Sequence, residues 1–216
     1  MCWSAKFIGD ETIHHKNLFE NNTYNMFAGI NCLLSEADGV VTYNGDRFDL
    51  PQLNRGFVEM RLPRPKPYKK IDLYRVVRKH FKFASNKLDF VCQALGLEGK
   101  IPNKGMDLWN RCMDGDAEAW AHMIEYNKQD VEITRQLYEA VLPWIDGHPN
   151  FALHTEADGR MHCPKCGSTN LQKRGLRHTQ TQSYQQYQCQ DCNSWFRERY
   201  TLVDRGSRGP ILTESP

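Results

Sequence analysis

One candidate for catalysis or metal binding is Asp49, which follows a stretch typical of a strand and a turn. Residues 40–42 are Val-Val-Thr, a β-branched run that predicts the end of a buried strand, and Asn44-Gly45-Asp46 predicts a turn. Residues 50–53 then begin a predicted helix, with Pro51 in its first turn. In open α/β sheets, ligands and catalytic groups gather outside the carboxyl ends of strands. Asp49 is therefore placed either for chemistry or as a helix cap.

A second candidate, Asp130, lies on the apolar face of a long predicted helix. The helix spans about residues 116–141, and its period places two polar side chains, Tyr126 and Asp130, on an apolar stripe. The stripe consists of Met123, Tyr126, Asp130, Ile133, Leu137 and Val141. A carboxylate within such a stripe is costly unless it is paired or binds a metal ion. One interpretation is a hydrogen-bonded core contact between Tyr126 and Asp130. The second carboxylate, at Asp49, favours metal binding instead.

A third group with chemical potential consists of four paired cysteines. Cys163-Pro164-Lys165-Cys166 and Cys189-Gln190-Asp191-Cys192 are two C-x-x-C pairs separated by 22 residues. Each pair can direct two thiolates at one ion, and this spacing is typical of a zinc ribbon with tetrahedral Zn²⁺. Four thiolates leave no open position on the ion, so the zinc is expected to be structural. The other four cysteines are scattered and are expected to be reduced.

Cations and aromatic residues surround the cysteine pairs. They are expected to supply phosphate contacts and stacking surfaces for DNA or RNA. The alternative is a ribbon that docks another protein or only stabilises the chain. The residues of this group are Lys165, Lys173, Arg174, Arg177, Arg197, Arg199, Tyr184, Tyr187 and Trp195.

The composition narrows the class of protein. Apolar residues make up 40% and charged residues 25% of the 216 residues, as in a globular protein. No apolar run approaches the roughly 18 residues of a membrane span, and the N-terminus lacks a leader pattern, so we expect a cytoplasmic protein without a membrane partner. Residues 1–159 hold 19 Lys and Arg against 22 Asp and Glu, whereas residues 160–216 hold 9 against 4. The basic end indicates a polyanionic partner such as nucleic acid.

Four segments are expected to position these groups. The first, over residues 1–146, is an α/β domain that begins with strands near residues 1–8 and 11–14 and a helix over 24–36. A further helix is predicted with Ser85 as its N-cap. The remaining segments are a linker, a β-rich zinc ribbon and a disordered tail, over residues 147–160, 161–201 and 202–216.

Two of these stretches resemble a known family. Tyr43-Asn44-Gly45-Asp46-Arg47-Phe48-Asp49-Leu50-Pro51 resembles the second exonuclease motif of the DEDD superfamily, the 3′ to 5′ exonucleases with a ribonuclease H-like fold. Tyr126-Asn127-Lys128-Gln129-Asp130 resembles the third motif in its tyrosine (DEDDy) form. Lys87-Leu88-Asp89-Phe90-Val91 is similar to a segment between those motifs in proofreading domains of family B DNA polymerases. Over about residues 1–145, the resemblance is closest to the stand-alone YprB-type exonuclease-domain proteins.

The resemblance implies a mixed sheet flanked by helices and a site with two Mg²⁺ or Mn²⁺ ions. Asp49 and Asp130 would hold the ions, and Tyr126 would position the attacking water. Asn44 and Phe48 would contact the terminal nucleotide. The implied substrate is nucleic acid. A single-stranded 3′ end and DNA are the expected forms, while the sequence leaves RNA and a duplex end open.

The family's first motif, an Asp-x-Glu on the opening strand, has no counterpart in this sequence. Asp10-Glu11 lacks the intervening residue, and Asp116-Ala117-Glu118 lies on the late helix. The expectation is that the chain lacks the first strand, through truncation or a late start, and carries half of the metal site. The alternative function is a catalytically inactive nuclease fold that acts as a nucleic-acid-binding scaffold.

Overall fold

The chain divides into two compact units. The computed structural model describes residues 1–97, 105–154, 158–209 and 211–213. The N-terminal unit is Met1–Val141 and the C-terminal unit is Leu142–Pro216. Among the described residues, no helix combines the length and apolarity needed to cross a membrane.

The N-terminal unit begins with an antiparallel hairpin and a helix. Strands β1 (Cys2–Lys6) and β2 (Ile13–Asn17) pair along their length. Helix α1 (Thr23–Glu36) follows, capped by Asn22, whose side chain accepts a hydrogen bond from the Asn25 amide. The Trp3 indole donates to the carbonyl of Met26 at 2.9 Å, which fastens β1 to α1.

A parallel strand pair flanks the segment that resembles the second exonuclease motif. We call its residues 43–48, between β3 and α2, the motif loop. Strands β3 (Gly39–Thr42) and β4 (Lys69–Asp72) pair in parallel, and helix α2 (Asp49–Glu59) connects them. The connection is a βαβ unit, which a parallel pair requires. Buried side chains of α1 and α2 form a core beneath both sheets: Met26, Phe27, Ile30, Leu34 and Phe57.

Four more helices complete the N-terminal unit. Their bounds are Leu73–His80 (α3), Leu88–Ala94 (α4), Met106–Met113 (α5) and Ala117–Val141 (α6). The prediction that Ser85 caps α4 is wrong: the cap position is Lys87, and the Ser85 hydroxyl instead accepts a bond from the Lys87 amide at 3.3 Å. The sequence did not predict α5, in which Leu108 and Cys112 are the buried residues.

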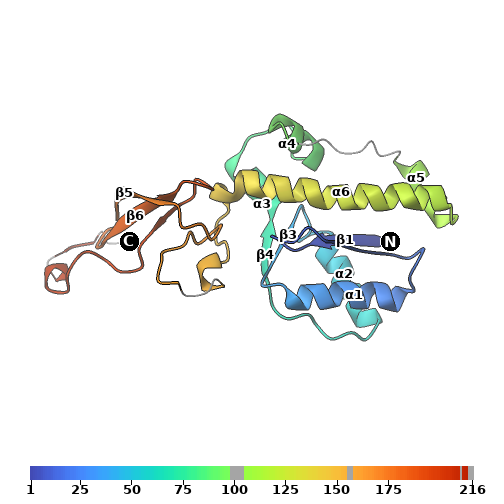
Figure 1. The fold of residues 1–216 in the computed structure, drawn as a ribbon, viewed down its shortest axis with the longest axis horizontal. Helices are drawn as coiled ribbons and strands as arrows, with labels where there is room; N and C mark the ends of the chain where they lie inside the picture. Colours follow the sequence, from blue (N-terminus) through green and yellow to red (C-terminus); the bar gives the residue numbers. More distant parts are fainter. Residues whose placement is uncertain (98–104, 155–157, 210, 214–216) are drawn as a thin grey trace. The chain divides into compact units, whose positions relative to one another are not determined.

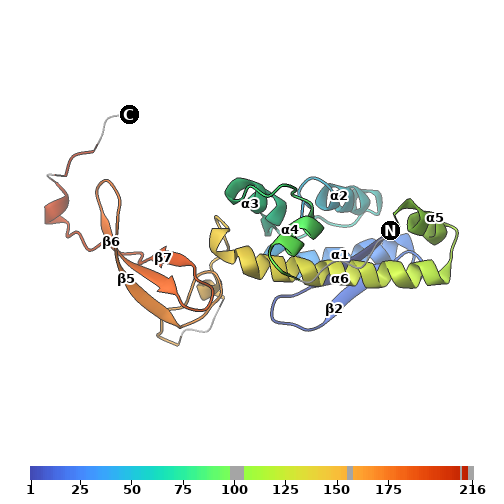
Figure 2. The same ribbon diagram turned by 90° about the horizontal axis from the view of Figure 1, so that it is seen from above.

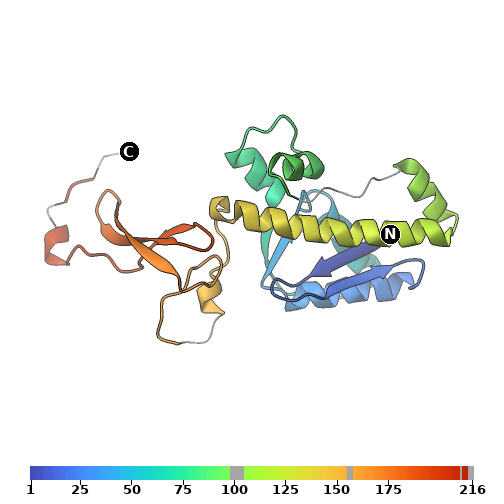
Figure 3. The same cartoon turned by 45° about the horizontal axis from the view of Figure 1, so that its top comes forward.

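The sheets lie between two layers of helices. Figure 1 shows α6 on one side of β1 and β3, with α1 and α2 on the other, and Figure 3 shows the same order for β1. The contacts agree, because Ala5 and Val40 pack against the α1 core while Lys6 pairs with Glu132 of α6 at 3.4 Å. The expected single mixed sheet is present as two separate pairs, β1-β2 and β3-β4. Among the described strands, β1 and β3 therefore each pair along one edge.

Gly56 allows α2 to pack closely against α1, which yields a testable prediction for stability. A Cβ atom at this position would overlap the ring of Phe27. Gly56→Ala is therefore expected to destabilise the N-terminal unit by about 1–3 kcal/mol in urea unfolding. This loss exceeds the roughly 1 kcal/mol that alanine adds to a helix interior.

A double-mutant cycle provides the control for Gly56→Ala. Phe27→Leu alone costs packing, but it also removes the ring that the new methyl group would meet. The double variant should lose less free energy of unfolding than the sum of the two single losses. Additive losses would contradict the proposed steric cause.

The C-terminal unit is built on a three-stranded antiparallel sheet. Figure 2 shows its strands, whose bounds are Leu171–His178 (β5), Ser183–Cys189 (β6) and Trp195–Arg197 (β7). Three short 3-10 helices accompany them: Leu142–Trp144, Phe151–Leu153 and Gly206–Arg208.

The described parts of the predicted linker and tail make specific hydrogen bonds. The Phe151 amide donates to the Pro164 carbonyl at 2.8 Å, so this part of the linker packs against the first cysteine pair. The Leu202 amide donates to the Ser183 carbonyl at 2.7 Å, and the Asp204 carboxylate accepts from the Ser207 amide at 3.0 Å. Some residues of the predicted tail thus make specific contacts with the sheet edge and with a side-chain cap.

Candidate functional site

The loop between β3 and α2 has a tightly defined backbone. Asn44 has a φ of 63°, a conformation that Asn tolerates better than most residues. At Gly45, an added Cβ would lie 2.6 Å from the Thr42 side chain, so a larger residue has no room there. The Gly45 carbonyl accepts a bond from the Leu50 amide at 2.9 Å, which ties the loop to the first turn of α2. These constraints fix the position of Asp49 relative to β3.

Asp72, at the end of β4, anchors this loop from the neighbouring strand. Its carboxylate is buried and accepts bonds from the Asn44 amide at 2.7 Å and the Tyr74 amide at 3.1 Å. Asp72 thus caps α3 and also holds the motif loop. The capping role could be read from a strand-to-helix junction in the sequence, but the contact with Asn44 depends on the parallel register of β3 and β4.

Tyr43 provides a second anchor. Its hydroxyl donates to the Asn86 carbonyl at 2.6 Å, and its ring packs edge-on against Tyr74 with 5.8 Å between the centroids. Burial raises the pKa of Tyr43, so the hydroxyl remains a neutral donor at physiological pH. Tyr43 therefore has a positioning role in this loop.

Asp49 is the first residue of α2, and its carboxyl group has an unusual environment. The residue is exposed overall, yet loss of hydration raises the pKa of the Asp49 carboxyl, and the negative charge of Asp72 adds to this effect. A group in such surroundings gains from a nearby cation, because a positive charge favours the ionised carboxylate. Phe48, immediately before it, is 63% exposed. The loop therefore presents a carboxyl group beside an accessible aromatic ring.

The α6 candidates lie where the periodicity places them. Tyr126 and Asp130 are half-buried, on the helix face that buries Met123 and Ile133. Sequence reasoning missed Asn127, whose side-chain oxygen is buried without a hydrogen-bond partner among the described residues. Buried amide oxygens without a hydrogen-bond partner are rare in proteins. The Asn127 oxygen is therefore a further candidate to bind a metal ion or substrate on this helix.

The carboxylates do not form a complete multi-ligand metal site in the described part of the chain. A group of three or more His, Cys, Asp or Glu side chains that could share an ion occurs there only at the four cysteines. Among the described residues, neither Asp49 nor Asp130 belongs to such a group. This agrees with the absence of an Asp-x-Glu pair from the opening strand.

The four cysteines, in contrast, are already assembled. The sulfur atoms of Cys163, Cys166, Cys189 and Cys192 all lie within 4.8 Å of one another. The Cys163–Cys192 and Cys166–Cys189 sulfur pairs are each 3.6 Å apart, close to the separation of thiolates around a tetrahedral zinc ion. Burial raises the pKa of Cys163 to about 11, so ionisation of this thiol requires a cation. The donor set fits zinc.

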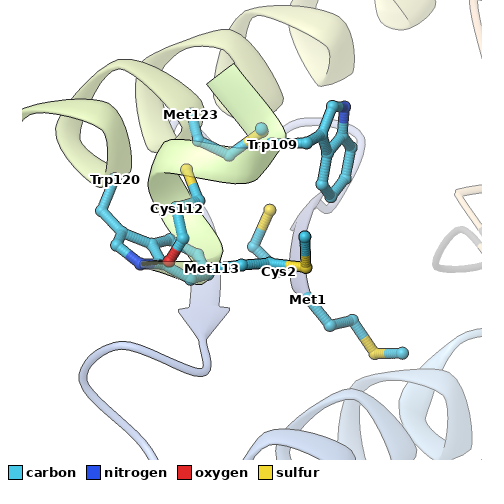
Figure 4. A pocket seen from close by; sticks show the side chains of 7 residues that line it. All are labelled: Met1, Cys2, Trp109, Cys112, Met113, Trp120 and Met123. Carbon is cyan, nitrogen blue, oxygen red and sulfur yellow. Dashed lines mark hydrogen bonds between the residues drawn. The ribbon is translucent and has the colours of Figure 1, made fainter. Parts of the chain in front are cut away.

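The apolar cavity drawn in Figure 4 does not belong to either candidate site. It measures about 40 Å³ and is lined by Met1, Cys2, Trp109, Cys112, Met113, Trp120 and Met123. This volume accommodates about one water molecule and is too small for a nucleotide. None of its lining side chains is acidic.

The comparisons with known proteins give one finding for the N-terminal unit. A family model described as the RNase H superfamily matches residues 7–142, which is more than half of the chain. The matched range includes the motif loop and the whole of α6. No curated protein matches the chain.

Proposed function

The chain belongs to the RNase H superfamily, and on this basis we propose that it is a metal-dependent 3′ to 5′ exonuclease of the DEDDy, YprB-like type. The proposed substrate is nucleic acid with a single-stranded 3′ end, preferably DNA. The observation that carries the proposal is the position of Asp49 at the start of α2, directly after a loop that is held by hydrogen bonds of Asp72 and Tyr43. A loop this constrained can orient a carboxylate before substrate arrives.

Each candidate residue has a role in this proposal. Asp49 and Asp130 hold Mg²⁺ or Mn²⁺, which suits the raised pKa of the Asp49 carboxyl. Bound as a pair, such ions activate water and stabilise the leaving 3′ oxygen. Tyr126, one helical turn before Asp130, orients the attacking water. Asn44 and the exposed Phe48 contact the terminal nucleotide.

A second candidate function is a nucleic-acid-binding scaffold without catalysis. It is favoured because, among the described residues, neither Asp49 nor Asp130 belongs to a group of three or more side chains that could share a metal ion. Both candidates share the fold and the polymer, and they differ in whether a phosphodiester is cleaved.

The cysteine cluster is proposed to hold a structural zinc ion in a zinc ribbon. Four thiolates fill a tetrahedral coordination sphere, so this ion takes no part in hydrolysis. All eight cysteines have free thiols in the structure. The proposed compartment is the cytoplasm, where thiols stay reduced and available to zinc.

A directional degradation assay tests the nuclease proposal. With Mg²⁺ or Mn²⁺, the chain should convert 5′-labelled single-stranded DNA into a ladder of shorter labelled products. The same DNA labelled at its 3′ end should release labelled mononucleotide from the start. RNA of the same sequence should be degraded more slowly.

The control reaction omits the divalent cation and should leave the DNA intact. Products that shorten from the 5′ end, or internal cuts, would contradict the proposal. Binding of the DNA without cleavage in either metal would favour the scaffold.

A further inference from the structure

The sheet of the C-terminal unit has two chemically different faces. In its register, Arg177 lies opposite Tyr184, Arg197 opposite Gln186, and Trp195 opposite Gln188. Because opposed residues share a face and successive residues alternate, these side chains lie together. The face that we call the arginine–aromatic face consists of Arg174, Arg177, Tyr184, Trp195 and Arg197, with glutamines between them.

The opposite face holds the unit together. Tyr187 is buried there, stacks on Phe196 with an interplanar angle of 10°, and donates to the Glu198 carboxylate at 2.6 Å. Cys189, a buried member of the sulfur cluster, lies two residues farther along β6 on the same face. The arginine–aromatic face is therefore not needed for the core.

Contacts within the arginine–aromatic face hold its planar guanidinium groups and aromatic rings in defined positions. The Arg197 guanidinium lies 3.6 Å above the centre of the Tyr184 ring. Arg174 donates to the Gln188 side chain at 3.1 Å, which orients its guanidinium. Trp195 is 52% exposed. The strand register places no Asp or Glu on this face of β5, β6 and β7.

We propose that the arginine–aromatic face binds single-stranded nucleic acid. Bases stack on Trp195 and on the Tyr184–Arg197 pair, while Arg174 and Arg177 contact phosphates. Stacking requires exposed base faces, which a single strand offers and a duplex does not. The inference deepens the proposed function and rests on it for the class of polymer.

The structure narrows the candidates that the sequence suggested for this interface. Lys165 is engaged elsewhere, because its ammonium group donates to the carbonyls of Leu142 and Pro143 at 2.9 and 2.8 Å. Tyr187 is buried, and Lys173 lies opposite it on the other face. Lys173 is exposed and lies outside the proposed interface, so it offers a control with the same charge.

Binding of labelled oligothymidylate to the full zinc-loaded chain tests this inference. Fluorescence anisotropy is measured without Mg²⁺ or Mn²⁺, so that cleavage does not interfere. Trp195→Ala should weaken binding roughly tenfold, the effect typical of losing one stacked base. Trp195→Phe should restore most of the affinity, since a phenyl ring still stacks.

Two charge variants separate this face from general attraction to a basic protein. Arg177→Gln should weaken binding. It should also reduce the slope of log affinity against log salt concentration by about 1, the change expected when one phosphate contact is lost. Lys173→Gln removes the same charge from the opposite face and should leave both quantities nearly unchanged. Zinc content, measured for every variant, confirms that the ribbon is folded.

Several outcomes would overturn the inference. They are unchanged affinity in Trp195→Ala, equal effects of Arg177→Gln and Lys173→Gln, equal affinity for duplex DNA, and no binding by the zinc-loaded chain. A chain that binds through Trp195 but cleaves nothing would overturn the exonuclease alone, whereas a chain that cleaves but binds independently of Trp195 would overturn this inference alone.

Discussion

Asp130→Ala is expected to abolish 3′ to 5′ degradation. The variant removes one of two carboxylates proposed to hold the ions, and metal stabilisation of a phosphodiester transition state is worth several kcal/mol. A loss of this size lowers the rate by about 10³-fold or more. The measurement is the initial rate of product formation from 5′-labelled single-stranded DNA, at saturating Mg²⁺ or Mn²⁺.

The matched control for this variant is Asp114→Ala. Asp114 is an exposed aspartate that follows α5, outside the candidate site, so its removal should leave the rate unchanged. In Asp130→Ala the carbonyl of residue 130 can still accept the bond from the Thr134 hydroxyl, so helix α6 should stay folded, and circular dichroism of the variant checks this. Wild-type activity in Asp130→Ala would refute the assignment of Asp130 as a metal ligand.

Removal of zinc is expected to unfold the C-terminal unit. The described apolar core of this unit is small and consists of Leu142, Ile145, Cys163, Tyr187 and Cys189. Two of these side chains, Cys163 and Cys189, are thiols of the sulfur cluster. Structural zinc in small domains contributes about 10–16 kcal/mol of apparent free energy at neutral pH. Apolar burial on this scale cannot replace it. Cys163→Ser should therefore cause loss of the β5–β7 amide resonances in NMR spectra, while those of the N-terminal unit persist.

The control variant is Cys32→Ser, which changes an exposed cysteine of α1 outside the sulfur cluster. It should keep both the zinc content and the spectrum of the wild type. If the β5–β7 amides of a zinc-free chain stayed protected from exchange, the C-terminal sheet would fold without the ion and the prediction would be wrong. Zinc affinity should also fall as the pH is lowered, because the Cys163 thiol must lose its proton to bind.

The sequence predicted the structure best where a helical apolar pattern extends over many residues, as in α6, or where a metal-binding spacing occurs twice, as in the two C-x-x-C pairs. The stripe on α6 was confirmed in Met123, Ile133, Leu137 and Val141, all of which are buried. Such a pattern survives because many contacts enforce it at once. Helix α5 has Leu108 and Cys112 as its buried residues, too few to establish a period, and it was missed.

Contacts between neighbouring strands could not be predicted from the sequence, because they depend on the register in which the strands pair. The loop anchor at Asp72 depends on which residue of β3 lies opposite it. In the sheet of the C-terminal unit, the register of β5 and β6 shifts between Lys173 and Leu176, where Gly175 has a φ of 75°. A shift of one residue moves every following side chain to the other face. This irregularity sets the face of Arg177, and local composition does not encode it.

In the described part of the N-terminal unit, each strand of the pairs β1–β2 and β3–β4 has one edge without a strand partner, and this bears on how the protein behaves at high concentration. An unpaired strand edge is a template on which a second chain can add, and proteins usually blunt it with charge, proline or a covering element. The net charge of +2 offers little long-range repulsion between molecules. We therefore expect chain association at high concentration to begin at such unpaired edges, and a segment that pairs with one of them should raise the concentration at which the protein stays monomeric.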